Sequence, residues 1–160
     1  MYSMRAARTF DSQYVQKHMP DLLTVYRDLQ DLVSERIGEP VYQAPLEGPL
    51  SVCVISYDKP GDAIQWHYDD NYFQGRFFTV LVPVTRQRTC SSYQYRNAQG
   101  VPENVRLEET GEALLFEGNK VFHRSVPLCP DEHRVIASFQ FTTDPRVKNP
   151  LLKRIKEIFF

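Results

Sequence analysis

The sequence lacks the features that mark membrane, exported and nucleic-acid-binding proteins. It has no apolar run of about 18 residues or more, so it predicts no membrane-spanning helix. Its 160 residues carry 19 Lys and Arg against 20 Asp and Glu, a net charge of −1, which leaves no excess of positive charge for a nucleic acid. No apolar leader opens the chain. We therefore expect a cytoplasmic protein without a membrane or nucleic-acid partner.

Cysteine is scarce as well. The three cysteines, Cys53, Cys90 and Cys129, are odd in number, and none stands at CxxC spacing from another. This pattern argues against a disulfide framework or a zinc knuckle and favours a reducing compartment. Cys53 lies within an apolar run, so we expect it in the core.

Short strand-like segments dominate the sequence after residue 50. They cover approximately 50–57, 64–69, 76–84, 90–95, 104–107, 112–117, 121–126 and 133–143. Eight short strands predict a jelly roll, which is a cupin-like double-stranded β-helix. The length fits one domain, 1–160, with the jelly-roll core at about 50–143. The polar segment 86–104 is either a solvated hairpin or part of a substrate entrance.

Helical signals flank this core, so the expected fold class is mainly β with flanking helices. In residues 11–38, a helical cover, apolar residues recur at the spacing of one buried stripe: Leu22, Tyr26, Leu29 and Val33. Gly38 is placed to end that helix. Residues 145–160 have a basic amphipathic pattern, which predicts a C-terminal helix docked on the barrel.

Two candidate metal ligands stand two residues apart at the end of an apolar segment. In an extended strand, His67 and Asp69 would leave the same face with their Cα atoms about 6.5 Å apart. An imidazole and a carboxylate are two of the three ligands in the facial triad that binds non-haem Fe(II). A bare His-x-Asp is a common pattern, so an ordinary ion pair at a strand end is the alternative unless a second histidine joins it.

Three other histidines are available to complete the site. His18 lies in the helical region, and His133 would point to the opposite strand face from Arg134. His123 follows a Gly-Asn turn and enters a short apolar strand. We therefore expect His123 to be the third ligand.

Arg134 opens a strand of alternating character. One face would carry Arg134, Ile136, Ser138 and Gln140, and the other face the apolar residues between them. An arginine on the inner face of a strand needs an anion, and its planar fork suits a carboxylate. Ser138 and a tyrosine hydroxyl are placed to complete the cradle. The alternative is a structural ion pair.

These motifs, taken in order, resemble the Fe(II)/2-oxoglutarate-dependent dioxygenases, and their local spacing is similar to the prolyl-hydroxylase branch. The order is Tyr57, His67-x-Asp69, His123, and then Arg134 with Ser138. As in that branch, a tyrosine precedes the first ligand by ten residues and a hydroxyl residue follows the arginine by four. Ile64 and Gln140 depart from the branch at positions that would line the pocket.

The resemblance implies a site and a reaction. Fe(II) would be bound by His67, Asp69 and His123. The co-substrate 2-oxoglutarate would be anchored by Arg134, Tyr57 and Ser138, and ascorbate is a candidate additional cofactor. The implied reaction hydroxylates an aliphatic C–H bond of an amino acid, peptidyl side chain or small metabolite, with release of succinate and CO₂. The alternative is a non-catalytic cupin-like metal-binding or scaffold domain. Substrate and oligomeric state stay open.

Overall fold

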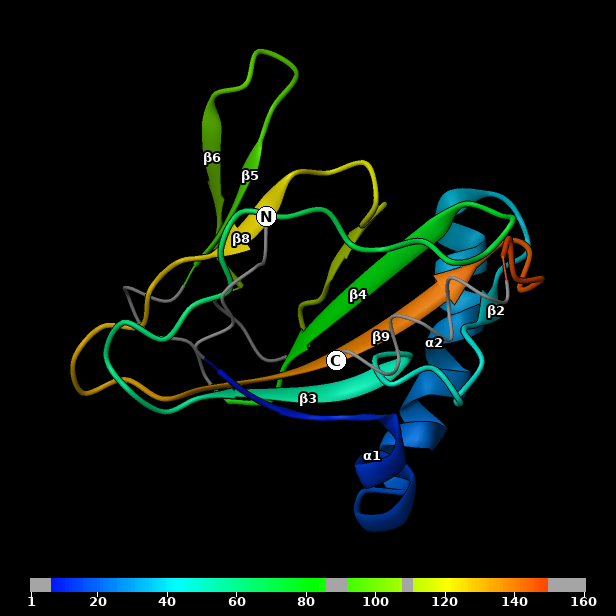
Figure 1. Cartoon of the computed structure of the whole chain (residues 1–160), viewed down its shortest axis with the longest axis horizontal. Helices are drawn as coiled ribbons and strands as arrows, with labels where there is room; N and C mark the ends of the chain where they lie inside the picture. The colour runs from blue at the N-terminus through cyan, green and yellow to red at the C-terminus, as the bar shows by residue number, and fades with distance from the viewer. Residues whose placement is uncertain (1–6, 86–91, 108–110, 150–160) are drawn as a thin grey trace.

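A computed structural model describes residues 7–85, 92–107 and 111–149, which form two antiparallel sheets with two helices on one side (Figure 1). The large sheet has the strand order β1-β3-β9-β4-β7, with β2 paired to β9. Its strands are β1 (Arg8–Phe10), β2 (Tyr42–Gln43), β3 (Val52–Tyr57), β4 (Phe77–Pro83), β7 (Leu114–Phe116) and β9 (Arg134–Thr142). The small sheet has the order β6-β5-β8. It contains β5 (Tyr93–Arg96), β6 (Pro102–Val105) and β8 (His123–Ser125). The prediction of a mainly β jelly roll with helical cover at its N-terminal end is confirmed.

Strand β9 divides the interior into two parts because its side chains alternate as predicted. Ala137, Phe139 and Phe141 face the helices and belong to the main hydrophobic core. Ile136, Ser138 and Gln140 face the opposite way and line an internal cavity. The large sheet therefore has one face covered by helices and one face that carries polar groups toward the small sheet.

The helices form where the sequence predicts them. Helix α1 (Ser12–His18) is capped by Asp11, whose carboxylate accepts a hydrogen bond from the backbone N–H of Tyr14 at 2.8 Å. Helix α2 (Asp21–Ile37) ends at Gly38, which has a left-handed φ of 77°. Tyr26 and Val33 of the predicted stripe are buried, and Leu22 and Leu29 pack against the same core.

One tyrosine ties the helical layer to the strand that lines the cavity. The Tyr26 hydroxyl accepts a hydrogen bond from the Ala44 backbone N–H at 2.9 Å and donates to the backbone carbonyl of Gln140. Burial raises the pKa of this hydroxyl well above its usual range. Tyr26 therefore stays a neutral donor that holds α2 beside β9.

Three expectations from the sequence need correction. Residues 64–69 do not form a continuous strand; their backbone pairs with other segments at isolated points, including a single bridge from His67 to His123. Residues 145–149 are not helical, because Val147 forms a bridge with Phe73 that uses this segment as an extended partner. The rest of the predicted C-terminal helix, 150–160, lies outside the described residues. Cys129 takes part in a disulfide, although the odd number and the spacing of the cysteines argued against a disulfide framework.

The polar segment after β4 is a hairpin in the part that the structure describes. Strands β5 and β6 pair through the turn at residues 97–100. Residues 86–91 of the segment lie outside the described part, so its role at a substrate entrance stays a prediction. No helix within the described ranges is long and apolar enough to cross a membrane.

Candidate metal centre and adjoining cavity

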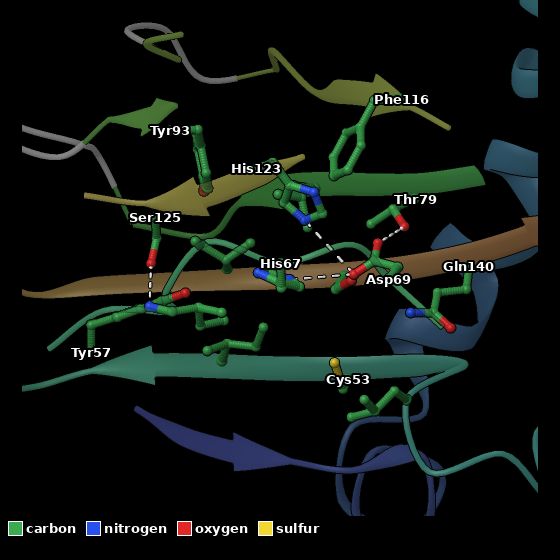
Figure 2. A pocket seen from close by; sticks show the side chains of 16 residues that line it. Cys53, Tyr57, His67, Asp69, Thr79, Tyr93, Phe116, His123, Ser125 and Gln140 are labelled. Atoms are coloured by element: carbon green, nitrogen blue, oxygen red, sulfur yellow. Dashed lines mark hydrogen bonds and ion pairs between the residues drawn. The ribbon is translucent and has the colours of Figure 1, made fainter. Parts of the chain in front are cut away.

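The structure brings together the three residues predicted to bind a metal. His67, Asp69 and His123 each offer one ligand atom, and these atoms all lie within 4.8 Å of one another. The Nε2 atoms of His67 and His123 are 3.4 Å and 3.7 Å from the same carboxylate oxygen, Oδ1 of Asp69 (Figure 2). Two imidazoles and a carboxylate around one point form the donor set of a facial triad.

The other two histidines lie elsewhere. His133 forms an ion pair with Asp58 at 2.8 Å, with more than half of its side chain exposed. His18 is exposed on α1, where its ring packs 4.4 Å from the ring of Tyr14. The structure therefore places His123 at the cluster and keeps His133 and His18 away from it.

A pair of backbone hydrogen bonds sets the two histidines side by side. The N–H of His67 donates to the carbonyl of His123 at 2.9 Å, and the N–H of His123 donates back at 3.0 Å. Directly paired residues of an antiparallel bridge point their side chains to the same face. As a result the two imidazole rings lie 4.2 Å apart by their centroids.

The turn after β7 brings Asp69 to the cluster. The Asp69 N–H donates to the carbonyl of Gly118 at 3.0 Å. A Cβ atom on Gly118 would lie 2.2 Å from Oδ2 of Asp69, which is far inside van der Waals contact. Only glycine lets the carboxylate approach this turn so closely.

Hydrogen bonds fix which nitrogen of each histidine faces the cluster. Nδ1 of His67 is 2.7 Å from the carbonyl of Gln65, and Nδ1 of His123 is 2.8 Å from the carbonyl of Val121. A carbonyl only accepts, so each Nδ1 carries the proton, and the lone pair of each neutral ring is on Nε2. This is the usual arrangement for histidine ligands of a metal.

A threonine holds the carboxylate in place. The Thr79 hydroxyl donates to Oδ2 of Asp69 at 2.6 Å, which leaves Oδ1 facing both imidazoles. Burial alone would raise the pKa of Asp69. When the imidazoles also carry a proton on Nε2, the hydrogen bond from His67, the charge of His123 and the hydroxyl of Thr79 together outweigh burial, so this pKa is lowered. Burial also lowers the pKa of His123, with a smaller opposing effect from Asp69.

A cavity of about 60 Å³ adjoins the cluster and runs along the inner face of β9. The register of the large sheet places Gln140 beside Thr79, at the end near Asp69, and Ser138 beside Cys53 and Leu81. Tyr57 lies at the opposite end, as Figure 2 shows. The cavity therefore leads from the group formed by His67, Asp69 and His123 toward Tyr57.

Arg134 is paired in register with Tyr57, which lines this far end, although Arg134 itself is not among the lining residues. Its side chain is fully buried, and its guanidinium lies 4.2 Å from the centre of the Tyr57 ring. Nη2 donates to the carbonyl of Val126 at 2.7 Å, whereas Nε has no hydrogen-bond partner. None of the ion pairs among the described residues includes Arg134. A buried charge without a counter-ion is costly, so the site favours an anion.

The sequence did not reveal several residues of the site. Thr79 and Phe116 stand in apolar strands where no local pattern separates them from core positions, and Tyr93 stands in the polar segment 86–104. The ring of Phe116 packs edge-on against His123 with centroids 4.6 Å apart. Gly118 was visible only as a turn residue, since its contact with Asp69 depends on the fold. Ser138 lines the cavity but lies four residues along β9 from Arg134, so it is not beside the guanidinium in the register.

The contact between Thr79 and Asp69 yields a prediction. Thr79→Val keeps the shape of the side chain but removes the donor that orients the carboxylate. We expect it to weaken divalent-metal affinity by about 10- to 100-fold, as is typical for partners of metal ligands. Thr79→Ser, the matched control, should retain most of the affinity. Isothermal titration calorimetry with Zn²⁺ or Ni²⁺ measures both, and equal affinities for the Val and Ser variants would contradict the role.

A second prediction concerns the metal-free protein and pH. Because the pKa of His123 is lower in the folded state than its ordinary value of 6.5, the unfolded chain takes up this proton first as the pH falls. The free energy of unfolding should therefore decrease as the pH falls from about 6.5. His123→Gln should flatten this dependence, whereas His18→Gln, at an exposed position, should not. Urea unfolding at a series of pH values measures this free energy. If the wild-type free energy of unfolding does not change below pH 6.5, the lowered pKa of His123 is refuted.

The comparisons with known proteins concern the fold. No protein-family model and no curated protein sequence matches the chain. The solved structure of the non-haem alpha-ketoglutarate-dependent epimerase SnoN from nogalamycin biosynthesis matches with a TM-score of 0.67 and 12% identity, over 94% of this chain and 70% of that one. EvdO2 from Micromonospora carbonacea var. aurantiaca matches with a TM-score of 0.67 and 14% identity, over 92% of this chain and 72% of that one.

A third structure carries the name of an enzyme family. An oxidoreductase of the 2OG-Fe(II) oxygenase family from Burkholderia pseudomallei matches with a TM-score of 0.51 and 11% identity, over 61% of this chain. The chain spans 46% of the length of that protein, which is less than half. Alpha-ketoglutarate and 2-oxoglutarate (2OG) are the same compound. The chain thus has the jelly-roll fold of the 2-oxoglutarate- and Fe(II)-dependent oxygenase structures.

Proposed function

We propose that this protein is an Fe(II)- and 2-oxoglutarate-dependent oxygenase that binds iron through His67, Asp69 and His123. The observation that carries the proposal is the donor set: two Nε2 lone pairs and one carboxylate oxygen converge within 4.8 Å. This set fits the metal, because two neutral imidazoles and one carboxylate on one face of the ion leave other positions open. The fold supports the same proposal, since the matched structures include a 2OG-Fe(II) oxygenase and an alpha-ketoglutarate-dependent epimerase.

Arg134 and Tyr57 supply the binding site for the co-substrate in this proposal. A buried guanidinium that has no ion-pair partner among the described residues, and that lies beside Tyr57 at the opposite end of the cavity from His67, Asp69 and His123, suits the distal carboxylate of 2-oxoglutarate. The Tyr57 ring under the guanidinium holds its plane in position. Ser138 lies between the two ends and would contact the middle of a bound dicarboxylate.

Bound iron would supply the redox chemistry that couples the decarboxylation of 2-oxoglutarate to oxidation of a substrate C–H bond. In the proposed hydroxylation, O₂ gives one oxygen atom to succinate and one to the new hydroxyl group, with release of CO₂. The residues of the chain hold this chemistry in place. His67 and His123 keep their protons on Nδ1 and present Nε2, and Thr79 keeps Oδ1 of Asp69 toward the cluster. The apolar rings and chains of Phe116, Leu81 and Ile136 limit access of water to the cavity.

Asp69 favours hydroxylation over halogenation. A carboxylate in this position fills a coordination site and repels a halide by its charge. Its lowered pKa keeps it ionised. The alternative, a non-catalytic cupin-like domain, gives no reason to bury Arg134 beside Tyr57 at the end of the same cavity with no counter-ion among the described residues.

The metal assignment gives a prediction with matched controls. Asp69→Asn, His67→Ala and His123→Ala should each lower Fe(II) affinity by more than about 100-fold, since the loss of an outer partner alone costs about 10- to 100-fold. They should also abolish 2-oxoglutarate turnover. Asp70→Asn and His133→Ala should bind Fe(II) like the wild type. The proposal fails if Asp70→Asn loses the metal while Asp69→Asn retains it, or if wild-type protein with Fe(II) produces no succinate.

The proposed role of Arg134 as the anchor of 2-oxoglutarate gives another prediction. Arg134→Lys should raise the dissociation constant for 2-oxoglutarate by about 10- to 150-fold, because losing one charged hydrogen bond costs about 1.5 to 3 kcal/mol. Arg124→Lys is the control, since Arg124 packs on Trp66 outside the cavity. Calorimetric titration of the Ni²⁺-loaded protein with 2-oxoglutarate separates binding from turnover. An unchanged dissociation constant in Arg134→Lys would move the anchor elsewhere.

A further inference from the structure

A second and larger cavity, about 230 Å³ in volume, adjoins the candidate metal centre. It is lined by β7 (Leu114–Phe116), by residues 93–95 of β5, and by Leu81, Val105, Val121 and His123. We call it the apolar chamber. The large sheet ends at β7, so the chamber lies where the edge of that sheet faces the small sheet. The two cavities share four lining residues, Leu81, Tyr93, Phe116 and His123. One of them, His123, is a candidate metal ligand.

The surface of the apolar chamber is almost entirely apolar, although Tyr93, Gln94, Tyr95 and His123 are among its lining residues. The Gln94 amide is hydrogen-bonded to Asn104 and Arg124, which do not line the chamber. Among its ten described lining residues there is no Asp, Glu, Lys or Arg. The hydroxyl of Tyr95 donates to the carboxylate of Glu103, which is exposed and does not line the chamber. A charged group would lose its hydration in this chamber and find no counter-ion, whereas a hydrocarbon group gains from burial.

The volume sets the size of the group that fits. An engineered cavity of about 150 Å³ lined by Leu, Ile and Phe side chains binds benzene. At about 230 Å³, the apolar chamber has room for a six-membered ring or a branched aliphatic chain. His123 lines both cavities, and the Phe116 ring packs edge-on against it.

We propose that the apolar chamber binds an uncharged hydrocarbon group of the substrate, aromatic or branched aliphatic, and holds it beside His123. As a statement about substrate, this rests on the proposed oxygenase function. It narrows the substrate classes left open by the sequence, because it disfavours a charged lysyl side chain. The two carboxylates of 2-oxoglutarate also do not suit the chamber, since no Lys or Arg is among its described lining residues.

Binding to the metal-free protein tests the chamber separately from catalysis. The probes are benzyl alcohol and benzylammonium, which share a ring and differ in charge at neutral pH. In ¹H–¹³C NMR titrations, benzyl alcohol should shift the methyl signals of Leu81, Val105 and Leu114. Benzylammonium should bind at least about tenfold more weakly, because the chamber offers its charge no partner.

Two valine positions on one hairpin provide a matched pair of variants. Val105→Phe fills the chamber and should weaken benzyl alcohol binding by at least about tenfold, since the ring takes the space of the probe. Val101→Phe places the same ring at a position that is 54% exposed and should leave binding within about twofold of the wild type. Leu114→Phe is a second filling variant, which decides the result if Val105→Phe does not fold.

Three outcomes would overturn the proposal: equal binding of the two probes, unchanged binding of benzyl alcohol in the filling variants, or its displacement by 2-oxoglutarate from the Ni²⁺-loaded protein. The last outcome would assign the chamber to the co-substrate. If the protein binds benzyl alcohol selectively but produces no succinate, the apolar chamber is a binding site for hydrocarbon groups, and only the oxygenase function is overturned.

Discussion

The candidate site depends on two backbone hydrogen bonds between His67 and His123. They join residues that are far apart in the chain. His67 belongs to no strand of either sheet, so this pair is an isolated bridge. Neighbouring contacts hold this isolated bridge in place. The Ser125 hydroxyl accepts from the N–H of Ile64 at 2.7 Å on one side, and Asp69 is fixed by Gly118 on the other. The side chains of His67 and Asp69 reach His123 because isolated hydrogen bonds at Ile64, His67 and Asp69, and not a continuous strand ladder, hold the backbone of residues 64–69.

Charge is distributed unevenly along the cavity that starts at this bridge. Asp69 supplies an ionised carboxylate at one end, balanced by imidazoles and a hydroxyl. Arg134, beside Tyr57 at the other end, supplies a cation whose partners among the described residues are carbonyl oxygens and the face of Tyr57. A ligand that joins the two ends must present an anionic group to Arg134 and metal-binding atoms near Asp69. Ile136, Ser138 and Gln140 of β9 line the cavity between the two ends, and the apolar chamber adjoins this cavity.

Much of this arrangement could be predicted from the sequence because it follows from local periodicity. Alternation along β9 correctly separates Ser138 and Gln140 from Phe139 and Phe141, and helical spacing finds the buried face of α2. The segment 64–69 was harder. Its apolar character indicates a strand, but its backbone partners come from β8 and from the turn at Gly118, which local pattern does not reveal.

Other parts of the site depend on contacts that no short pattern encodes. Thr79 has the character of any strand residue until the fold places Asp69 against it. The amphipathic pattern of 145–160 predicts a helix from its start, yet Val147 pairs with Phe73 because a strand partner is available there. The likeness of the motif spacing to prolyl hydroxylases stays a prediction, since the structural matches identify the fold and not a branch within it.

The absence of a side chain at Gly118 has a consequence for how this sequence can change over time. While Asp69 is present, its carboxylate occupies the space that a Cβ at position 118 would need, 2.2 Å from Oδ2 and 2.9 Å from Cγ. The Thr79 Oγ1 atom would also lie 2.7 Å from that Cβ. If a lineage replaced both Asp69 and Thr79 with smaller residues, that space would open and a side chain at position 118 would become tolerable. Once such a side chain was fixed, a reversion to aspartate at position 69 would meet a steric clash. Loss of the carboxylate would then be an evolutionary ratchet, because the way back requires two changes in the right order.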